Sequence, residues 1–449
     1  AGVFVLTGGP DTPRTKTRDS DPVAQYTLTF RKLLGLASAI GLSQRDRFEL
    51  SGQNLIDWLD DPQNSSETLK RNLASTSDSD LPSPVEIQVA SPQPNPTLFD
   101  GLDAPAAQDD SHAAAGRLAL REPIPFPSIQ ELTPERLASL RPHTLVTAEG
   151  FEERAFVSTE RLLNEFRPDV AISVTYPLIG YGERIRALLD AADGEVRTVA
   201  SDRSLVLDMP DRDGIGVVDT TGLSKKFIYH AIRDLLNRDG RVLAVYTEAE
   251  RYYPLNEDVA ERLGSAADDD YARLEACHDI LTGETRPYHF IPLHTGDVDD
   301  GQRRALLASS SAKHERLFSL LEERDYDHVE ILVPSGNSAR DDLARLAARV
   351  AAQDAHSCQT RQISSRSPED ALTAIRETYE EYYALSNFNF EVGLTGSKLQ
   401  AIALAAASTS LKFSQAWYVQ PDHFDISRFT EGVGRTRVFM IEAASPSSS

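Results

Sequence analysis

The chain has 449 residues, 40% of them hydrophobic, and a formal net charge of −23 from 69 acidic and 46 basic side chains. This length allows two or three domains with large buried cores. No apolar run approaches the roughly 18 residues that a membrane-spanning helix needs, and no signal-peptide pattern opens the sequence. We therefore expect a cytoplasmic protein without a membrane span, which excludes membrane-embedded functions.

The two cysteines, Cys277 and Cys358, lie far apart and have no companions at the spacing of metal ligands. A disulfide scaffold or a zinc module is therefore not expected, and the compartment is predicted to be reducing.

The basic residues are mostly arginine, 38 against eight lysines, a bias that points to a GC-rich genome or a salt-loving host. A net charge of −23 would ordinarily repel nucleic acid. In a salt-rich cytoplasm the Debye length falls to about 3 Å or less, so that net charge acts only on the nearest contacts. The acidity therefore weakens a DNA-binding prediction without excluding it.

Residues 1–75 are predicted to form a small, mainly helical module. Tyr26–Leu42 carries apolar residues at helical spacing, and Ser51 fits the N-cap of a further helix in the stretch RFELSGQNLIDWLDDP. The arrangement resembles the winged-helix modules of many archaeal proteins, which implies a contact with DNA or with a protein partner. A helical interaction domain that touches no DNA is an equal alternative.

The rest of the chain divides by composition. Residues 76–142 are rich in Ser, Pro, Asp and Ala and predict a linker. From about His143 onward, short β-branched runs alternate with amphipathic helical stretches, which predicts an α/β fold with two parallel, doubly wound sheets of about five strands each. The expected strands are TLVTAE, VAISVTY, EVRTVAS, GIGVVDT and VLAVYTE, followed by HFIPLHT, VEILVPS, CQTRQIS, FEVGLT and SQAWYVQ.

The two series of strands align in order and predict two tandem Rossmann-like units, residues 143–254 and 288–449, joined by a helical connector, residues 255–287. The correspondence of Ser224-Lys225 with Ser397-Lys398 carries most of this inference, because strands can match by accident in any chain of alternating strands and helices. Three further pairs follow the same order: Gly150 with Gly296, Val170 with Val329, and Tyr246 with Tyr418.

The repeated turn has the residue types of an anion site. In open parallel sheets, ligands bind beyond the carboxyl ends of the strands, where the next helix presents free N–H groups. Glycine allows close approach, a hydroxyl adds a donor, and lysine adds a mobile positive charge. Three of the eight lysines, Lys225, Lys226 and Lys398, lie in these two turns. The alternative interpretation is a lysine solvated at a helix start.

Other residues beside the predicted strands extend this candidate site. Glu152 and Arg154 follow the first strand, where the acids are either catalytic or simply favoured at a helix N-terminus. Tyrosines at the ends of the fifth strands are expected either to stack on the bases of a ligand or to pack at the edge of the sheet. The complete set of candidate ligand-binding residues is Gly150, Glu152, Arg154, Thr221, Gly222, Ser224, Lys225, Gly296, Gly336, Thr395, Gly396, Ser397 and Lys398.

Several common motifs are absent from the sequence. Neither turn has the spacing of a Walker A loop, and no G-x-G-x-x-G follows the first strand, so a nicotinamide or flavin site is not expected. Neither G-x-S-x-G nor H-E-x-x-H occurs. We expect no cofactor and no metal site, and we assign no catalytic residue.

The stretch GLTGSKLQAIALAAAS, a strand ending in T-G-S-K before an Ala- and Leu-rich helix, resembles the ligand-binding signature of CARF proteins, the CRISPR-associated Rossmann fold sensors. The resemblance implies that two Rossmann units in a two-fold arrangement bind a cyclic oligonucleotide second messenger. Both units would come from this one chain. The first half departs from the signature, with TTGLSK in place of TGSK.

Three functions are compatible with these features. The leading hypothesis is a sensor of a phosphate-bearing nucleotide in an antiviral defence or regulatory system, which passes its signal to the N-terminal module. The second is a nucleotide-processing enzyme, such as a ring-nuclease-like phosphodiesterase, with Glu152, Lys225 and Lys398 in the reacting region. The third is a scaffold subunit of a defence or DNA-processing complex. The sequence leaves the oligomeric state open, a homodimer included.

Overall fold

In the computed structural model, all described residues lie within residues 113–449, one of the two units into which the chain divides. The predicted winged-helix-like module and most of the predicted linker lie outside the described residues. Within the described part of the chain, no helix is both long and apolar enough to cross a bilayer. The structure describes residues 124–177, 180–202, 207–210, 214–266, 269–281, 284–299, 301–355, 357–385 and 388–444.

The first sheet has seven strands in the order β1-β15-β6-β5-β2-β3-β4. At one edge, β15 (Thr436–Glu442) pairs antiparallel with β6, and β1 (Ser128–Leu132) pairs antiparallel with β15. The other five strands are parallel and coincide with the five runs predicted for the first half. They are β2 (Thr144–Glu149), β3 (Val170–Thr175), β4 (Glu195–Ala200), β5 (Gly216–Asp219) and β6 (Arg241–Thr247).

The second sheet has six strands in the order β11-β10-β9-β12-β13-β8. The edge strand β8 (Glu284–Thr295) pairs antiparallel with β13. The five parallel strands are β9 (Arg304–Ser309), β10 (His328–Pro334), β11 (Cys358–Ile363), β12 (Asn389–Gly393) and β13 (Gln415–Phe424). These parallel sheets confirm the predicted α/β class.

Helices cover the faces of both sheets. Local signals fix several ends: Ser338 forms a capping box before α14, Ser367 caps α15 ahead of Pro368, and α10 ends before Gly240, whose φ is 68°. A π-helical turn, Glu380–Leu385, continues α15. Among the described residues, the α-helices are α7 (Arg136–Ser139), α8 (Glu153–Glu165), α9 (Gly182–Asp190), α10 (Lys225–Asp239), α11 (Asn256–Ser265), α12 (Asp270–Ala276), α13 (Glu315–Glu323), α14 (Ala339–Asp354), α15 (Pro368–Tyr379) and α16 (Lys398–Ala407).

The two halves repeat one strand order. The parallel part reads β4-β3-β2-β5-β6 in the first sheet and β11-β10-β9-β12-β13 in the second. In each sheet the chain moves outward from the first strand in one direction and then in the other. The order therefore reverses between β2 and β5, and between β9 and β12, which is where doubly wound sheets place their ligands.

One strand assignment from the sequence is wrong. HFIPLHT forms part of β8, the antiparallel edge strand, and the first parallel strand of the second half is β9, the run RALLAS. Gly296 follows β8, and its N–H donates to the carbonyl of Ser414, directly before β13 begins. Gly296 therefore lies at the opposite edge of the sheet from Ser397, and its pairing with Gly150 does not hold.

The predicted domain boundaries remain a prediction, although two strands of the first sheet come from outside residues 143–254. β1 falls within residues 76–142, predicted as a linker, and β15 falls within residues 288–449, predicted as the second unit. Both strands nevertheless complete the first sheet. The chain thus returns to its first half after finishing the second.

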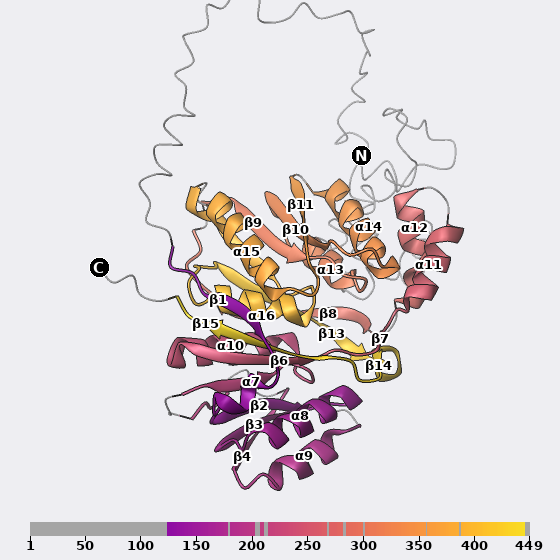
Figure 1. Ribbon diagram of the computed structural model, residues 1–449. Helices are drawn as coiled ribbons and strands as arrows, with labels where there is room; N and C mark the ends of the chain where they lie inside the picture. The colour runs from indigo at the N-terminus through magenta and orange to yellow at the C-terminus, as the bar shows by residue number, and fades with distance from the viewer. Residues whose placement is uncertain are drawn as a thin grey trace, which may run out of the picture. The chain divides into compact units, whose positions relative to one another are not determined.

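A single apolar core joins the halves. It runs from β3 and β5 through α10 and α16 to β12 and includes Phe227, Ile232, Ile402 and Phe390, all with no exposed surface. α10 and α16 pack against each other at its centre (Figure 1). Of the ten residues of α16, the last nine are buried, as expected for a helix that is apolar on all sides. This packing fixes the starts of α10 and α16, where the two repeated turns lie.

Candidate ligand-binding site

The two repeated turns face each other and exchange hydrogen bonds. The Nζ of Lys225, the first residue of α10, donates to the carbonyl oxygen of Gly396 over 2.6 Å. In return, the Nζ of Lys398, the first residue of α16, donates to the carbonyl oxygen of Thr221. Each lysine thus reaches across to the other turn. The structure brings together the two Ser-Lys turns that the sequence singled out.

The lysines are less exposed than a helix start usually is. The alternative interpretation, a lysine solvated at a helix start, requires exposed side chains, but Lys225 and Lys398 are half-buried and Lys226 is buried. Lys226 donates to the carbonyl of Ser201 over 3.0 Å and to the side-chain oxygen of Gln420 over 3.2 Å. The interpretation of these lysines as solvated side chains is therefore wrong.

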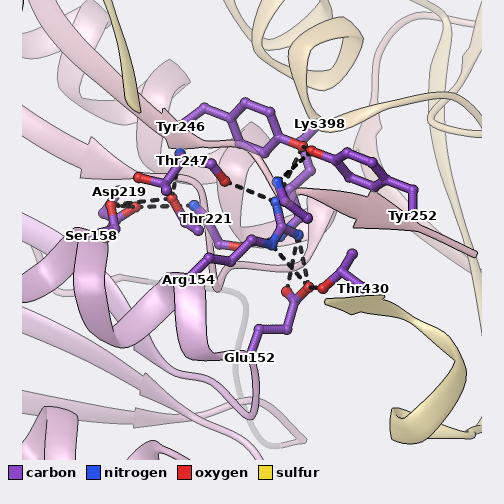
Figure 2. A network of polar contacts seen from close by, with 11 residues as sticks. Glu152, Arg154, Ser158, Asp219, Thr221, Tyr246, Thr247, Tyr252, Lys398 and Thr430 are labelled. Atoms are coloured by element: carbon purple, nitrogen blue, oxygen red, sulfur yellow. Dashed lines mark hydrogen bonds and ion pairs between the residues drawn. The ribbon is translucent and has the colours of Figure 1, made fainter. Parts of the chain in front are cut away.

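Glu152 and Arg154 form a buried ion pair beside the turns (Figure 2). Their exposed fractions are 9% and 2%. The guanidinium donates to the Glu152 carboxylate over 2.8–3.1 Å, to the Tyr246 hydroxyl over 3.2 Å and to the Thr247 carbonyl over 2.9 Å. Because these bonds occupy its N–H groups, Arg154 holds the site together and is not available to a ligand.

Burial changes the pKa of two charged groups in this network. Removal from water lowers the pKa of Lys398 to about 8, although the neighbouring Glu152 favours its charged form. Burial raises the pKa of Asp219, at the end of β5, despite hydrogen bonds from Ser158 and Thr221 that favour the carboxylate. Figure 2 shows Lys398 and Asp219 on either side of Thr221. Lys398 can therefore change its charge near neutral pH.

The hydroxyl groups predicted to bind the ligand are used within the protein. Thr221 Oγ1 accepts from the N–H of Thr247 over 2.9 Å. Thr395 Oγ1 donates to the carbonyl of Ser309 over 2.7 Å. Ser397 caps α16 in a capping box. Among these residues, Ser224 differs, because its Oγ is buried and has no hydrogen-bond partner in the described part of the chain.

The candidate glycines allow close approach of the backbone. A Cβ on Gly222 would lie 3.1 Å from the Ala155 side chain, and one on Gly396 would collide with Gln400, the residue that completes the capping box of α16. Gly150 lies directly against Gly222. Gly336 follows β10 and accepts a hydrogen bond from Arg345. These glycines shape the carboxyl edges of the two sheets.

A short ribbon stands beside the Glu152–Arg154 pair. It consists of β7 (Arg251–Tyr252) and β14 (Thr430–Glu431), which pair antiparallel. The Thr430 hydroxyl donates to the Glu152 carboxylate, and the Tyr252 hydroxyl lies 2.9 Å from that of Tyr246 (Figure 2). The ribbon therefore joins the end of β6 to the segment before β15 next to the site.

A second repeated motif escaped the sequence comparison. α8 begins Glu-Arg-Ala-Phe and α13 begins Glu-Arg-Leu-Phe. The arginines, Arg154 and Arg316, are both buried, and each lies near the ring of the corresponding tyrosine, 5.5 Å from Tyr246 and 5.9 Å from Tyr418. The pairing of Tyr246 with Tyr418 is consistent with the register, because each follows a residue whose carbonyl accepts from the start of a repeated turn.

Sequence reasoning also missed three residues beside the site: Lys313, Arg340 and Thr430. Lys313 lies in the loop after β9, which was not recognised as a strand. Arg340 lies in the first turn of α14 and carries no motif. A correct assignment of RALLAS would have placed Lys313 at the carboxyl edge. No cluster of three or more candidate metal ligands occurs among the described residues.

Comparisons with known proteins give little beyond this geometry. Neither protein-family profiles nor curated protein sequences match the chain. A Type III CRISPR defence DNA nuclease activated by cyclic oligoadenylate aligns at 12% identity and a TM-score of 0.39, over 62% of this chain and 65% of the nuclease. The chain thus spans less than two thirds of the length of that nuclease.

Two other solved structures align more weakly. An NADH-dependent reductase complexed with NAD aligns at 11% identity and a TM-score of 0.17, over 63% of this chain and 97% of the reductase. The phosphoethanolamine N-methyltransferase 1 of Haemonchus contortus aligns at 8% identity and a TM-score of 0.19, over 69% of this chain and 90% of the enzyme. TM-scores this low, including that of the nuclease, carry no argument about function.

Proposed function

We propose that this chain is a sensor that binds a cyclic oligonucleotide between its two halves, with phosphates of the ring contacted by Lys225 and Lys398. The reciprocal hydrogen bonds of these two lysines carry the proposal. A ring of repeating nucleotides presents equivalent phosphates on opposite sides. Two equivalent turns that face each other match such a ligand better than they match a mononucleotide.

A ligand could replace the groups that now accept hydrogen bonds from the two ammonium groups. Both donate to backbone carbonyls, which are neutral. A phosphate oxygen is a charged acceptor, and charge-assisted hydrogen bonds are roughly twice as strong as neutral ones. The starts of α10 and α16 add the positive ends of two helix dipoles. The ligand would therefore replace carbonyl contacts with phosphate contacts at both turns.

The proposed biological role is antiviral defence or a related regulatory system, in line with the resemblance of GLTGSK to the CARF signature. Ligand binding would change how α10 and α16 meet and pass this change to residues 1–75, the predicted winged-helix-like module. DNA or a protein partner would then receive the signal. A copurifying nuclease or helicase would instead favour the scaffold role.

Calorimetric titration of the full chain tests the binding proposal. Cyclic oligoadenylates of several ring sizes are compared with the linear oligoadenylates of the same length. We expect one ring size to bind and the linear forms to bind far more weakly, since a ring is already closed. If no cyclic oligonucleotide of any base composition gives heat, the proposal is wrong.

Cleavage of the ring is a second candidate, favoured by one observation. Lys398, whose pKa burial lowers to about 8, lies beside the carboxylate of Glu152, and groups of this kind can transfer protons near neutral pH. Incubation of the bound ligand followed by chromatography separates the two functions. A pure sensor returns the intact ring, whereas a phosphodiesterase yields linear products.

A further inference from the structure

Tyr252 in the ribbon and Phe429 directly before β14 supply two aromatic rings that lie close to cationic side chains of the second half. The Tyr252 ring has the Arg154 guanidinium 5.7 Å from its centre and the Arg340 guanidinium of the second half 5.3 Å from it. The Phe429 ring, directly before β14, packs edge-on against Phe151 and has the Lys313 ammonium of the second half 3.8 Å from its centre. The second half therefore presents cations to this ribbon.

Arg340 and Arg154 touch the same ring but differ in their partners. Arg154 is neutralised by the carboxylate of Glu152. No carboxylate lies within ion-pair distance of the Arg340 guanidinium among the described residues. The two acids that follow Arg340 in α14 are bonded elsewhere: Asp341 accepts from the N–H and hydroxyl of Ser338, and Asp342 pairs with Arg345 over 2.6 Å.

The surroundings of Arg340 disfavour its charge. Removal from water lowers the pKa of Arg340, and the nearby Asp341 and tyrosine hydroxyls only partly offset this effect. Its backbone N–H is occupied by Asn256, but the guanidinium is held by the face of Tyr252. A guanidinium that lies over an aromatic ring is held by a cation–π contact, which leaves its planar N–H donors to bind the oxygens of an anion.

We propose that Arg340 is an anion-binding residue of the second half, which holds a phosphate group of the ligand while its guanidinium lies over the Tyr252 ring. The identity of the ligand as a cyclic oligonucleotide rests on the function proposed above, whereas the anion contact itself does not. Arg340 would add a third phosphate contact to those of Lys225 and Lys398. The ligand would then be bound asymmetrically, with more contacts to the second half.

The test compares Arg340→Gln with Arg349→Gln in the full chain. Both substitutions remove one arginine from α14, but Arg349 is an exposed residue paired with Asp270 on the surface. We expect Arg340→Gln to weaken binding of the cyclic oligonucleotide by roughly 10- to 100-fold. Arg349→Gln should stay within about twofold of the wild type. Arg340→Lys, which keeps the charge but not the planar fork, should recover part of the affinity.

Inorganic tripolyphosphate serves as a second probe, so that failure of the ligand and failure of Arg340 give different results. Loss of tripolyphosphate binding in Arg340→Gln alone supports the inference even if no cyclic oligonucleotide binds. Equal binding of either probe by the wild type and Arg340→Gln overturns it, and so does a wild type that binds neither. Thermal unfolding of each variant shows whether a loss of binding is a loss of folding.

Discussion

The Nζ of Lys225 donates a 2.6 Å hydrogen bond to the carbonyl of Gly396, 171 residues away, and Lys398 donates in the opposite direction to Thr221. One contact of this kind would be an ordinary surface feature. Two reciprocal contacts at the starts of equivalent helices show that the two turns are complementary to each other. The interface of the two halves is therefore where we propose that a symmetric anion binds.

Replacing both lysines should weaken ligand binding without abolishing folding. Each charge-assisted contact contributes ~1.5–3 kcal/mol, or about 10- to 150-fold in affinity, so the Lys225→Ala and Lys398→Ala double variant should lose ~100-fold or more. Calorimetric titration measures the loss. Lys412→Ala is the matched control, because Lys412 is exposed beyond the end of α16. Wild-type affinity in the double variant would refute the site.

Binding should depend on pH through Lys398. Its pKa of about 8 means that it is mostly charged at pH ~7 and mostly neutral at pH ~9. Because only the charged form attracts a phosphate, affinity should fall as the pH rises through about 8. Lys398→Met, which keeps the length but not the charge, should bind more weakly and lose this dependence. A wild-type pH profile as flat as that of Lys398→Met would contradict the assignment.

Breaking the buried Glu152–Arg154 pair should destabilise the fold. Glu152→Ala leaves the guanidinium of Arg154 buried and uncompensated, which costs ~3–5 kcal/mol. Chemical denaturation followed by circular dichroism measures the change in the free energy of unfolding. Glu153→Ala, one residue along and exposed, should change it by ~0.5 kcal/mol or less. Equal stability of the two variants would show that the pair contributes little.

The shared core predicts that the described halves unfold together. Ile402 on α16 is fully buried in the core cluster that contains both sheets. Ile402→Ala should cost ~2–5 kcal/mol and shift one cooperative transition of residues 124–444. Val298→Ala, at an exposed position, is the control. Separate transitions for the two halves, with only one of them shifted, would show that the core is not continuous.

Much of the fold was predictable because the chemistry is local. Nine of the ten strands expected between Thr144 and Gln420 lie in parallel ladders where alternating β-branched runs indicated them. The Ser-Lys turns were recognisable because the same combination of Gly, Ser and Lys follows a buried strand at two places in the chain. The strand RALLAS was missed since Ala and Leu favour helix, and burial at the centre of a sheet overrides that preference.

The details of the site were less predictable because they depend on distant partners. Nothing in the sequence around Thr430 indicates that its hydroxyl meets Glu152, 278 residues earlier. The roles of Thr221 and Thr395 also depend on contacts with neighbouring strands, which turned their hydroxyls inward. Gly296 was misplaced since strand direction cannot be inferred from an alternating apolar run. Motifs thus indicated the candidate site, whereas tertiary packing decided which side chains are available in it.

The stoichiometry of binding tests the central claim most directly. If both turns contact one ring, calorimetric titration of the wild-type chain should saturate at one cyclic oligonucleotide per chain, and either single lysine variant should weaken that same event. Two independent binding events, each abolished by only one of Lys225→Ala and Lys398→Ala, would contradict the account.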